Sequence, residues 1–413
     1  MQNRILNFLL CGAAGALVFY LAPAPAGGQS TPAPPNDRVA RLEQQIERGE
    51  ATLEYRPGLG YLPSLLKLLD IHPDSQVLVF SKTSFQQALV SPKNPRAIFF
   101  NDDVSIGAVP GGELFEVSAL DPLRGVVFYT LMMRHSDQPR LERRSDVCLE
   151  CHGPVSVLVP GLMVTSVIPD ATGMPFFTGA FFNITDYRTP ISQRWGGWYV
   201  TGTSEPHLGN AVAPDPSHPT ELETQGTQNL TTLAGKFDTS KYLEPTSDIV
   251  ALMTLEHQTR MINLITSVSA QARSLIEKGK LDDATNARLD SAVEEIVNAL
   301  LFADEAELHQ SVKGVSSFTQ TFPRRGPRDK QGRSLRDFDL RKRMFRYPLS
   351  YMIYSDIFDN MEDTVRTRVY RRLYSILTGQ ETSPKYARLS AEDRSTILAI
   401  LRDTKPNLPA YFK

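Results

Sequence analysis

The sequence predicts an α+β fold in which a β-rich N-terminal part is followed by a helical C-terminal part. Between residues 77 and 131, short runs of β-branched and aromatic residues alternate with turn-forming Asn, Asp, Pro and Gly. From residue 246 onward, apolar residues recur at helical spacing instead. The 413 residues are enough for two domains with sizeable cores. The net charge of −2 gives no general reason to expect a nucleic acid partner.

Residues 1–26 are typical of an export signal. Arg4 precedes an uncharged apolar run over residues 5–21, and Ala24-Pro25-Ala26 fits a small-x-small cleavage site. The alternative is an uncleaved anchor, because the run is about as long as the shortest helices that cross a bilayer. We therefore expect a periplasmic or otherwise exported protein, with membrane contact only if the anchor is retained. Residues 27–36 follow as a Pro-rich tether.

A β-rich domain is expected over residues 37–245. It begins with a short amphipathic helix over residues 37–53, which Asp37 caps. An antiparallel sheet of roughly five strands follows. Further β-like runs cover residues 155–159 and 163–168, and residues 169–203 are rich in glycine and aromatic side chains that could wall a ligand or fill the core. The predicted strands of the sheet are residues 77–80, 97–100, 104–109, 114–117 and 126–131.

A helical domain is expected over residues 246–413. Thr246 or Ser247 is predicted to cap its first helix, and Ser390 with Asp393 resembles a capping box at the start of its last. The run 324–346 contains ten Arg and Lys against three Asp. Three interpretations are open for this basic run: docking of an acidic redox partner, neutralisation of a charged ligand, or a solvated loop with ion pairs inside the chain. The other predicted helices are residues 281–307, 351–358 and 365–377.

The motif Cys148-Leu149-Glu150-Cys151-His152 lies within the expected β-rich domain and is the pattern of a c-type haem attachment site. Two thiols on one turn can each form a thioether with a haem vinyl group, and His152 is then placed to be the proximal iron ligand. Removal of the signal would also remove Cys11, so the mature chain would have no cysteine left for a disulfide framework. A zinc ribbon would need a second Cys/His pair at regular spacing, and a thioredoxin-like site would need a βαβ context. We therefore predict one covalent haem c on a mixed scaffold, unlike the small all-helical cytochromes c.

The role of such a haem depends on the ligand opposite His152. We predict His257, on the first C-terminal helix, as the candidate distal ligand, and His207 as the next candidate. Weaker candidates are His135, Met163 and Met174. A second strong ligand would favour a monohaem electron carrier with a redox partner protein, which is the leading hypothesis.

An open distal position would favour other functions. One is a haem enzyme, peroxidase-like or a small-oxide reductase, for which Glu256, His257 and Arg260 could supply acid–base groups. Another is a haem redox or gas sensor. In any of these cases, Arg188 or Arg194 could pair with a haem propionate.

The stretch from residue 148 to the C-terminus resembles a family of uncharacterised bacterial exported proteins described as containing a cytochrome c domain. The resemblance implies one covalent haem and an export signal. Residue by residue, it carries over only Cys148, Cys151 and His152, and it implies no substrate. The segments that carry it are residues 148–154, 194–203, 255–261, 332–340 and 347–351.

Overall fold

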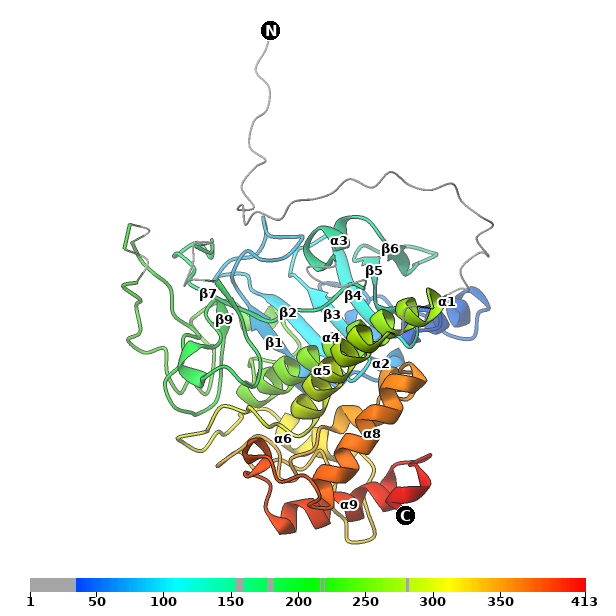
Figure 1. Ribbon diagram of the computed structural model, residues 1–413. Helices are drawn as coiled ribbons and strands as arrows, with labels where there is room; N and C mark the ends of the chain where they lie inside the picture. The colour runs from blue at the N-terminus through cyan, green and yellow to red at the C-terminus, as the bar shows by residue number, and fades with distance from the viewer. Residues whose placement is uncertain (1–34, 154–158, 177–181, 216, 219, 280–281) are drawn as a thin grey trace. The chain divides into compact units, whose positions relative to one another are not determined.

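The computed structural model describes residues 35–413, apart from residues 154–158, 177–181, 216, 219 and 280–281. Its residues Asn36–Lys413 form one compact unit. The predicted α+β class is confirmed, because an antiparallel sheet is followed by helices that lie mostly in the C-terminal part (Figure 1). The predicted signal, nearly all of the tether and most of the run 155–159 lie outside the described residues. No helix within the described residues is both long and apolar enough to cross a membrane.

Seven antiparallel strands form the main sheet, in the order β6-β5-β4-β3-β2-β1-β9. The five predicted strands correspond to β1 to β5, and β6 and β9 are added at the two edges. A separate pair, β7 (Thr165–Val167) and β8 (Phe182–Ile184), forms a small second sheet. The strands of the main sheet are β1 (Val77–Val79), β2 (Arg96–Phe100), β3 (Val104–Ala108), β4 (Leu114–Asp121), β5 (Gly125–Met132), β6 (Glu142–Arg144) and β9 (Trp198–Tyr199).

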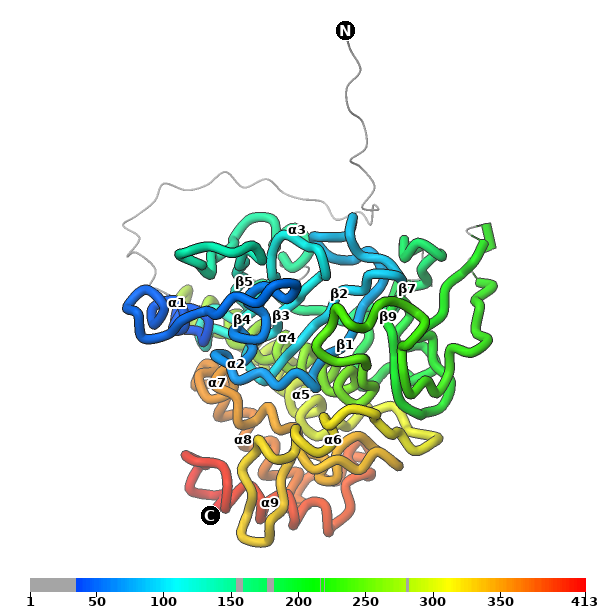
Figure 2. The backbone as a smooth tube through the Cα atoms, turned by 180° about the vertical axis from the view of Figure 1, so that it is seen from behind, coloured from blue at the N-terminus to red at the C-terminus, as the bar shows by residue number. Residues whose placement is uncertain are grey.

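Alternation along the strands gives the sheet two apolar faces. One face contributes Phe99, Val117 and Tyr129 to a core that it shares with α1 (Arg38–Glu47) and α2 (Leu62–Leu68). The opposite face contributes the side chains of Phe100, Leu120, Val126 and Phe128 to a second core, which includes α4 (Ile249–Glu277). Figure 1 shows α4 and α5 (Asp283–Leu300) in front of the sheet, and Figure 2 shows α1 and α2 from the other side.

The α4 helix joins the sheet to the C-terminal helices. Its apolar side chains belong to the same core as those of the sheet and of the later helices. The expected boundary between residues 245 and 246 therefore does not separate two cores. The predicted helix over residues 351–358 is a 3₁₀ turn (Tyr351–Tyr354) followed by the short α7, and the capping box at Ser390 and Asp393 is present. The other α-helices of the C-terminal part are α5 (Asp283–Leu300), α6 (Phe318–Thr321), α7 (Asp356–Asp359), α8 (Asp363–Leu377) and α9 (Ala391–Thr404).

Asp248 caps α4, in place of the predicted Thr246 or Ser247. The Ser247 hydroxyl is engaged elsewhere, since it accepts from the Leu78 amide of β1 and donates to the Tyr199 carbonyl of β9. Asp248 Oδ1 accepts from the amides of Val250 and Ala251 in the first turn. Its Oδ2 accepts from the amides of residues 315 and 316 and from the hydroxyl of residue 316. One buried carboxylate thus fixes both the helix start and the loop before α6.

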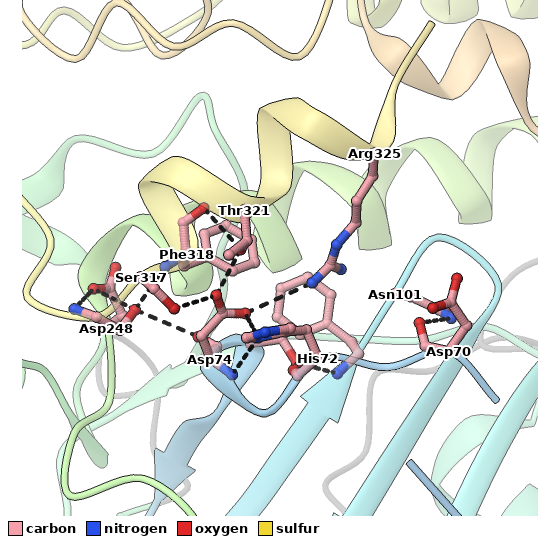
Figure 3. A network of polar contacts seen from close by, with 12 residues as sticks. Asp70, His72, Asp74, Asn101, Asp248, Ser317, Phe318, Thr321 and Arg325 are labelled. Carbon is pink, nitrogen blue, oxygen red and sulfur yellow. Dashed lines mark hydrogen bonds and ion pairs between the residues drawn. The ribbon is translucent and has the colours of Figure 1, made fainter. Parts of the chain in front are cut away.

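Asp74 forms a second buried junction beside this cap (Figure 3). Its Oδ2 accepts from Ser317 Oγ at 2.7 Å and from Thr321 Oγ1 at 2.5 Å. His72 Nδ1 lies 2.7 Å from Oδ1, and an Arg325 guanidinium nitrogen lies 3.6 Å from the same oxygen. The 3₁₀ turn before β1 is thereby tied to α6 and to the first part of the basic run.

Candidate functional site

A short helix, α3 (Val147–His152), places the side chains of the cysteine motif beside the main sheet. It follows edge strand β6 and lies near β5 and β6 in Figure 1. Positions three apart on a helix share a side, so the two thiols are presented together. The Cys148 side chain is half-buried and packs against the second core, which includes α4, whereas Cys151 is exposed. Burial raises the pKa of the Cys148 thiol, with a smaller contribution from the charge of Glu116.

His152 is held by two reciprocal hydrogen bonds with Gly161. Its ring Nδ1 lies 2.9 Å from the Gly161 carbonyl oxygen, and the Gly161 amide donates to the His152 carbonyl at 3.1 Å. Because a carbonyl only accepts, Nδ1 carries the proton and Nε2 keeps its lone pair. Burial lowers the pKa of His152, which favours the neutral imidazole that a metal requires. The ring also packs on Phe128 of β5, with centroids 4.9 Å apart.

The segment that holds His152 is itself positioned by α4. Asn263 Oδ1 accepts from the Leu162 amide at 2.9 Å, and Asn263 Nδ2 donates to the Leu162 carbonyl at 2.6 Å. The neighbouring Gly161 lies so close that a Cβ there would be 3.0 Å from Asn263 Oδ1. The sequence alone does not predict the supporting roles of Phe128, Gly161 and Asn263. No local pattern links these residues to the motif, because they are brought to this site only by the folding of the chain.

The structure gives His257 surroundings that do not suit the predicted distal ligand. Its ring is fully buried, and Nε2 lies 2.7 Å from Ser350 Oγ. It stacks on Phe302 at 4.3 Å between centroids and meets the edges of Tyr187 and Tyr351. Burial lowers the pKa of His257 to about 3. A ring nitrogen bonded to a hydroxyl and a ring face covered by an aromatic side chain point to a role in the core.

The other predicted distal ligands are also dispersed. His207 is buried beside Trp195, and its Nδ1 accepts a hydrogen bond from the Gly209 amide. His135 is exposed and meets the edge of Tyr55. Met163 is half-buried close to Leu162 in the chain, and Met174 is exposed. None of the described contacts of these side chains is with His152.

The arginines considered for a propionate are committed to other partners. Arg194 donates to Glu256 at 3.0 Å and to two backbone carbonyls, and both side chains are almost completely buried. Arg188 forms a bidentate pair with Asp186, which also attracts Arg260. The acid–base role considered for Glu256 is therefore replaced by a buried ion pair. Both tryptophans are core residues, as Trp195 and Trp198 are 0% and 4% exposed.

The basic run is largely paired within the chain. Arg336 forms an ion pair with Asp102, which is remote in the sequence, and its guanidinium lies over the rings of Phe322 and Tyr351. These contacts favour the interpretation of this run as a loop with internal ion pairs over that of a docking surface for an acidic partner. Further pairs join Arg325 to Asp74, Arg328 to Asp337, Lys330 to Asp403, Arg333 to Asp329 and Arg343 to Asp393.

The donor groups of α3 are the two thiols and the His152 imidazole, the set that covalent haem attachment would use. Within the described residues, no group of three or more His, Cys, Asp or Glu side chains is placed to hold a metal ion. With the proton on Nδ1, the His152 Nε2 carries the lone pair that an iron would need. Comparison of the chain with protein-family models, with curated proteins and with solved structures finds no match in any of the three.

Proposed function

We propose that Cys148 and Cys151 hold one covalent haem c, that His152 is its proximal ligand, and that the protein transfers electrons outside the cytoplasm. The observation that carries this proposal is the hydrogen bond from His152 Nδ1 to the Gly161 carbonyl. Metal-bound histidines generally donate their second ring nitrogen to such an acceptor, which fixes the tautomer and the ring orientation. Here the Gly161 carbonyl is that acceptor, and the histidine that it orients is the one that the motif predicts as the haem ligand.

The chain's own residues have separable roles in this proposal. The haem would supply a one-electron couple at its iron. His152 would donate Nε2, and Phe128 would shield one side of its ring from water. Asn263 would hold the 161–162 segment on α4. Export belongs to the same proposal, because haem c attachment takes place outside the cytoplasm, and a redox partner protein would exchange the electron.

Covalent attachment is tested by producing the full chain in a bacterial host that matures c-type cytochromes. We expect the purified protein to keep its haem in denaturant, and the double variant Cys148→Ser/Cys151→Ser to lose it. His152→Ala should retain the thioether-linked haem but show an altered Soret band. His135→Ala, on an exposed histidine, is the matched control and should leave the spectrum unchanged. A wild-type chain without covalent haem in this host would overturn the proposal.

One observation favours a second candidate function. Nε2 of His257 is hydrogen-bonded to Ser350 and its ring stacks on Phe302, and a proposed haem that His257 does not bind would have an open sixth position. We propose a haem enzyme or gas sensor as the alternative to an electron carrier. Electron paramagnetic resonance of the oxidised protein separates them, since a high-spin signal supports the alternative and a low-spin six-coordinate signal supports electron transfer. Binding of carbon monoxide to the reduced protein provides a second readout.

A further inference from the structure

Two oppositely charged side chains lie on the sheet face that holds His152. Glu116 of β4 stands opposite Thr130 of β5 in the register, and Phe128, which packs on the His152 ring, is the next residue on that face of β5. Arg96 of β2 lies on the same face, two residues before Ile98, which is paired with Gly107. The sheet thus presents a carboxylate and a guanidinium beside the motif.

Arg96 and Glu116 form a close ion pair at this place. Arg96 Nη2 lies 2.5 Å from Glu116 Oε2, and the two side chains are only 20% and 16% exposed. The guanidinium lies flat over Gly107, where an added Cβ would overlap it. Gln86 Nε2 lies 3.4 Å from the other carboxylate oxygen. The pair is partly buried, and its guanidinium occupies the space left by the missing side chain of Gly107, so it differs from a mobile surface ion pair.

The strand register places the pair close to the motif. Ser118, two residues after Glu116 on β4, is paired with Phe128 of β5, so Glu116 is a diagonal neighbour of Phe128 on one face of the sheet. The Phe128 ring packs on the His152 ring, with centroids 4.9 Å apart. Two opposite charges that are held together at this place offset each other in part at the motif.

We propose that the Arg96–Glu116 pair sets the reduction potential of the haem iron bound by His152. This inference rests on the proposed haem attachment. Uptake of one electron lowers the charge of the iron centre by one, so a nearby cation favours the reduced form and a nearby anion favours the oxidised form. Arg96 raises the potential and Glu116 lowers it, and the intact pair holds the local field near neutral. Because the pair is partly buried, salt screens it less than it screens surface charges.

The test is a spectroelectrochemical titration of the purified holoprotein and its variants. Arg96→Gln should lower the midpoint potential, because it leaves the Glu116 carboxylate uncompensated. Glu116→Gln should raise it. Gly107→Ala keeps both charges but displaces the guanidinium, and should shift the potential less far in the direction of Arg96→Gln. Arg343→Gln is the matched control, since Arg343 is comparably exposed and pairs with Asp393 of α9.

The outcomes separate this inference from the proposed function. Holoprotein in which Arg96→Gln and Glu116→Gln keep the wild-type potential, or shift it in the same direction, overturns the role of the pair while leaving haem attachment intact. Absence of covalent haem from the wild type overturns both. If Arg96→Gln does not fold, the opposite shifts of Glu116→Gln and Gly107→Ala carry the test, and their absence overturns the inference.

Discussion

The imidazole of His152 and the carbonyl of Gly161 are hydrogen-bonded across 2.9 Å, and the Gly161 amide returns a bond to the His152 carbonyl. This reciprocal contact joins the end of α3 to a segment that Asn263 of α4 holds in place. The orientation of the motif histidine therefore depends on a helix that begins almost a hundred residues later in the chain. The hydrogen bond fixes the orientation of the ring and the tautomer in which Nδ1 carries the proton.

Asn263→Ala should loosen the support of His152. The change removes both side-chain hydrogen bonds to Leu162, so we expect a loss of about 1–2 kcal/mol of stability. In the holoprotein, His152 ligation should be lost at a lower urea concentration, as followed by the Soret band. Asn263→Asp is the matched control because it keeps the acceptor for the Leu162 amide. Equal urea midpoints for Asn263→Ala and wild type would contradict this support role.

His257→Phe should affect stability and leave the haem spectrum unchanged. Phenylalanine preserves the stacking on Phe302 but removes the hydrogen bond to Ser350 Oγ, so we expect a loss of about 1–2 kcal/mol. Urea unfolding measures the stability, and the absorption spectrum of the oxidised holoprotein measures the ligation. A change from low-spin to high-spin iron in this variant would show instead that His257 is a ligand, against the packing described here.

Asp248→Ala should destabilise the protein strongly. The carboxylate accepts five hydrogen bonds from the start of α4 and from residues 315–316, and the alanine would leave these buried donors without their acceptor. We expect a loss of about 2–4 kcal/mol, since a cap and a buried polar junction are lost together. Asp282→Ala is the control, because Asp282 caps α5 at an exposed position, where water can replace the lost acceptor, so this variant should cost much less stability. Similar losses in both variants would contradict the junction role.

The buried Glu305 should make stability fall as pH rises. Burial raises its pKa to about 7, ahead of the opposing effect of its hydrogen bond from the Met344 amide. The folded chain therefore holds this proton more tightly than the unfolded chain, whose pKa is near 4.5. The stability contribution is full below about pH 4.5 and is lost as pH rises through about 7, by up to about 3 kcal/mol.

Glu305→Gln removes this titration while keeping an oxygen that can accept from Met344. Urea unfolding of both proteins between about pH 4 and 8, which spans the unfolded and folded pKa values of Glu305, should show wild-type stability falling relative to the variant. The carboxyl of Asp103, whose pKa burial raises to about 6, is present in both proteins and cancels in the difference. A stability difference that stays constant with pH would contradict the raised pKa.

The sequence by itself determined the fold class and most of its elements. Strands β1 to β5 follow from alternating β-branched and aromatic runs, and the late helices follow from apolar spacing, because both patterns are local. The cysteine motif is equally local, and it alone supports the haem proposal at this level. The cap of α4 was misplaced by one or two residues, since the choice of Asp248 depends on Ser247 being engaged by β1 and β9.

Only the tertiary structure decided how the motif is held and which charges surround it. Gly161, Asn263 and the Arg96–Glu116 pair come from separate segments of the chain, and the contact between Leu162 and Asn263 spans 101 positions. The surroundings of His257 also depend on the tertiary structure. Its position on a helix is compatible with a ligand, but its ring stacks on Phe302 and its Nε2 is hydrogen-bonded to Ser350. Local patterns fix periodicity and spacing, whereas the neighbours of a buried polar side chain depend on long-range packing that the pattern does not contain.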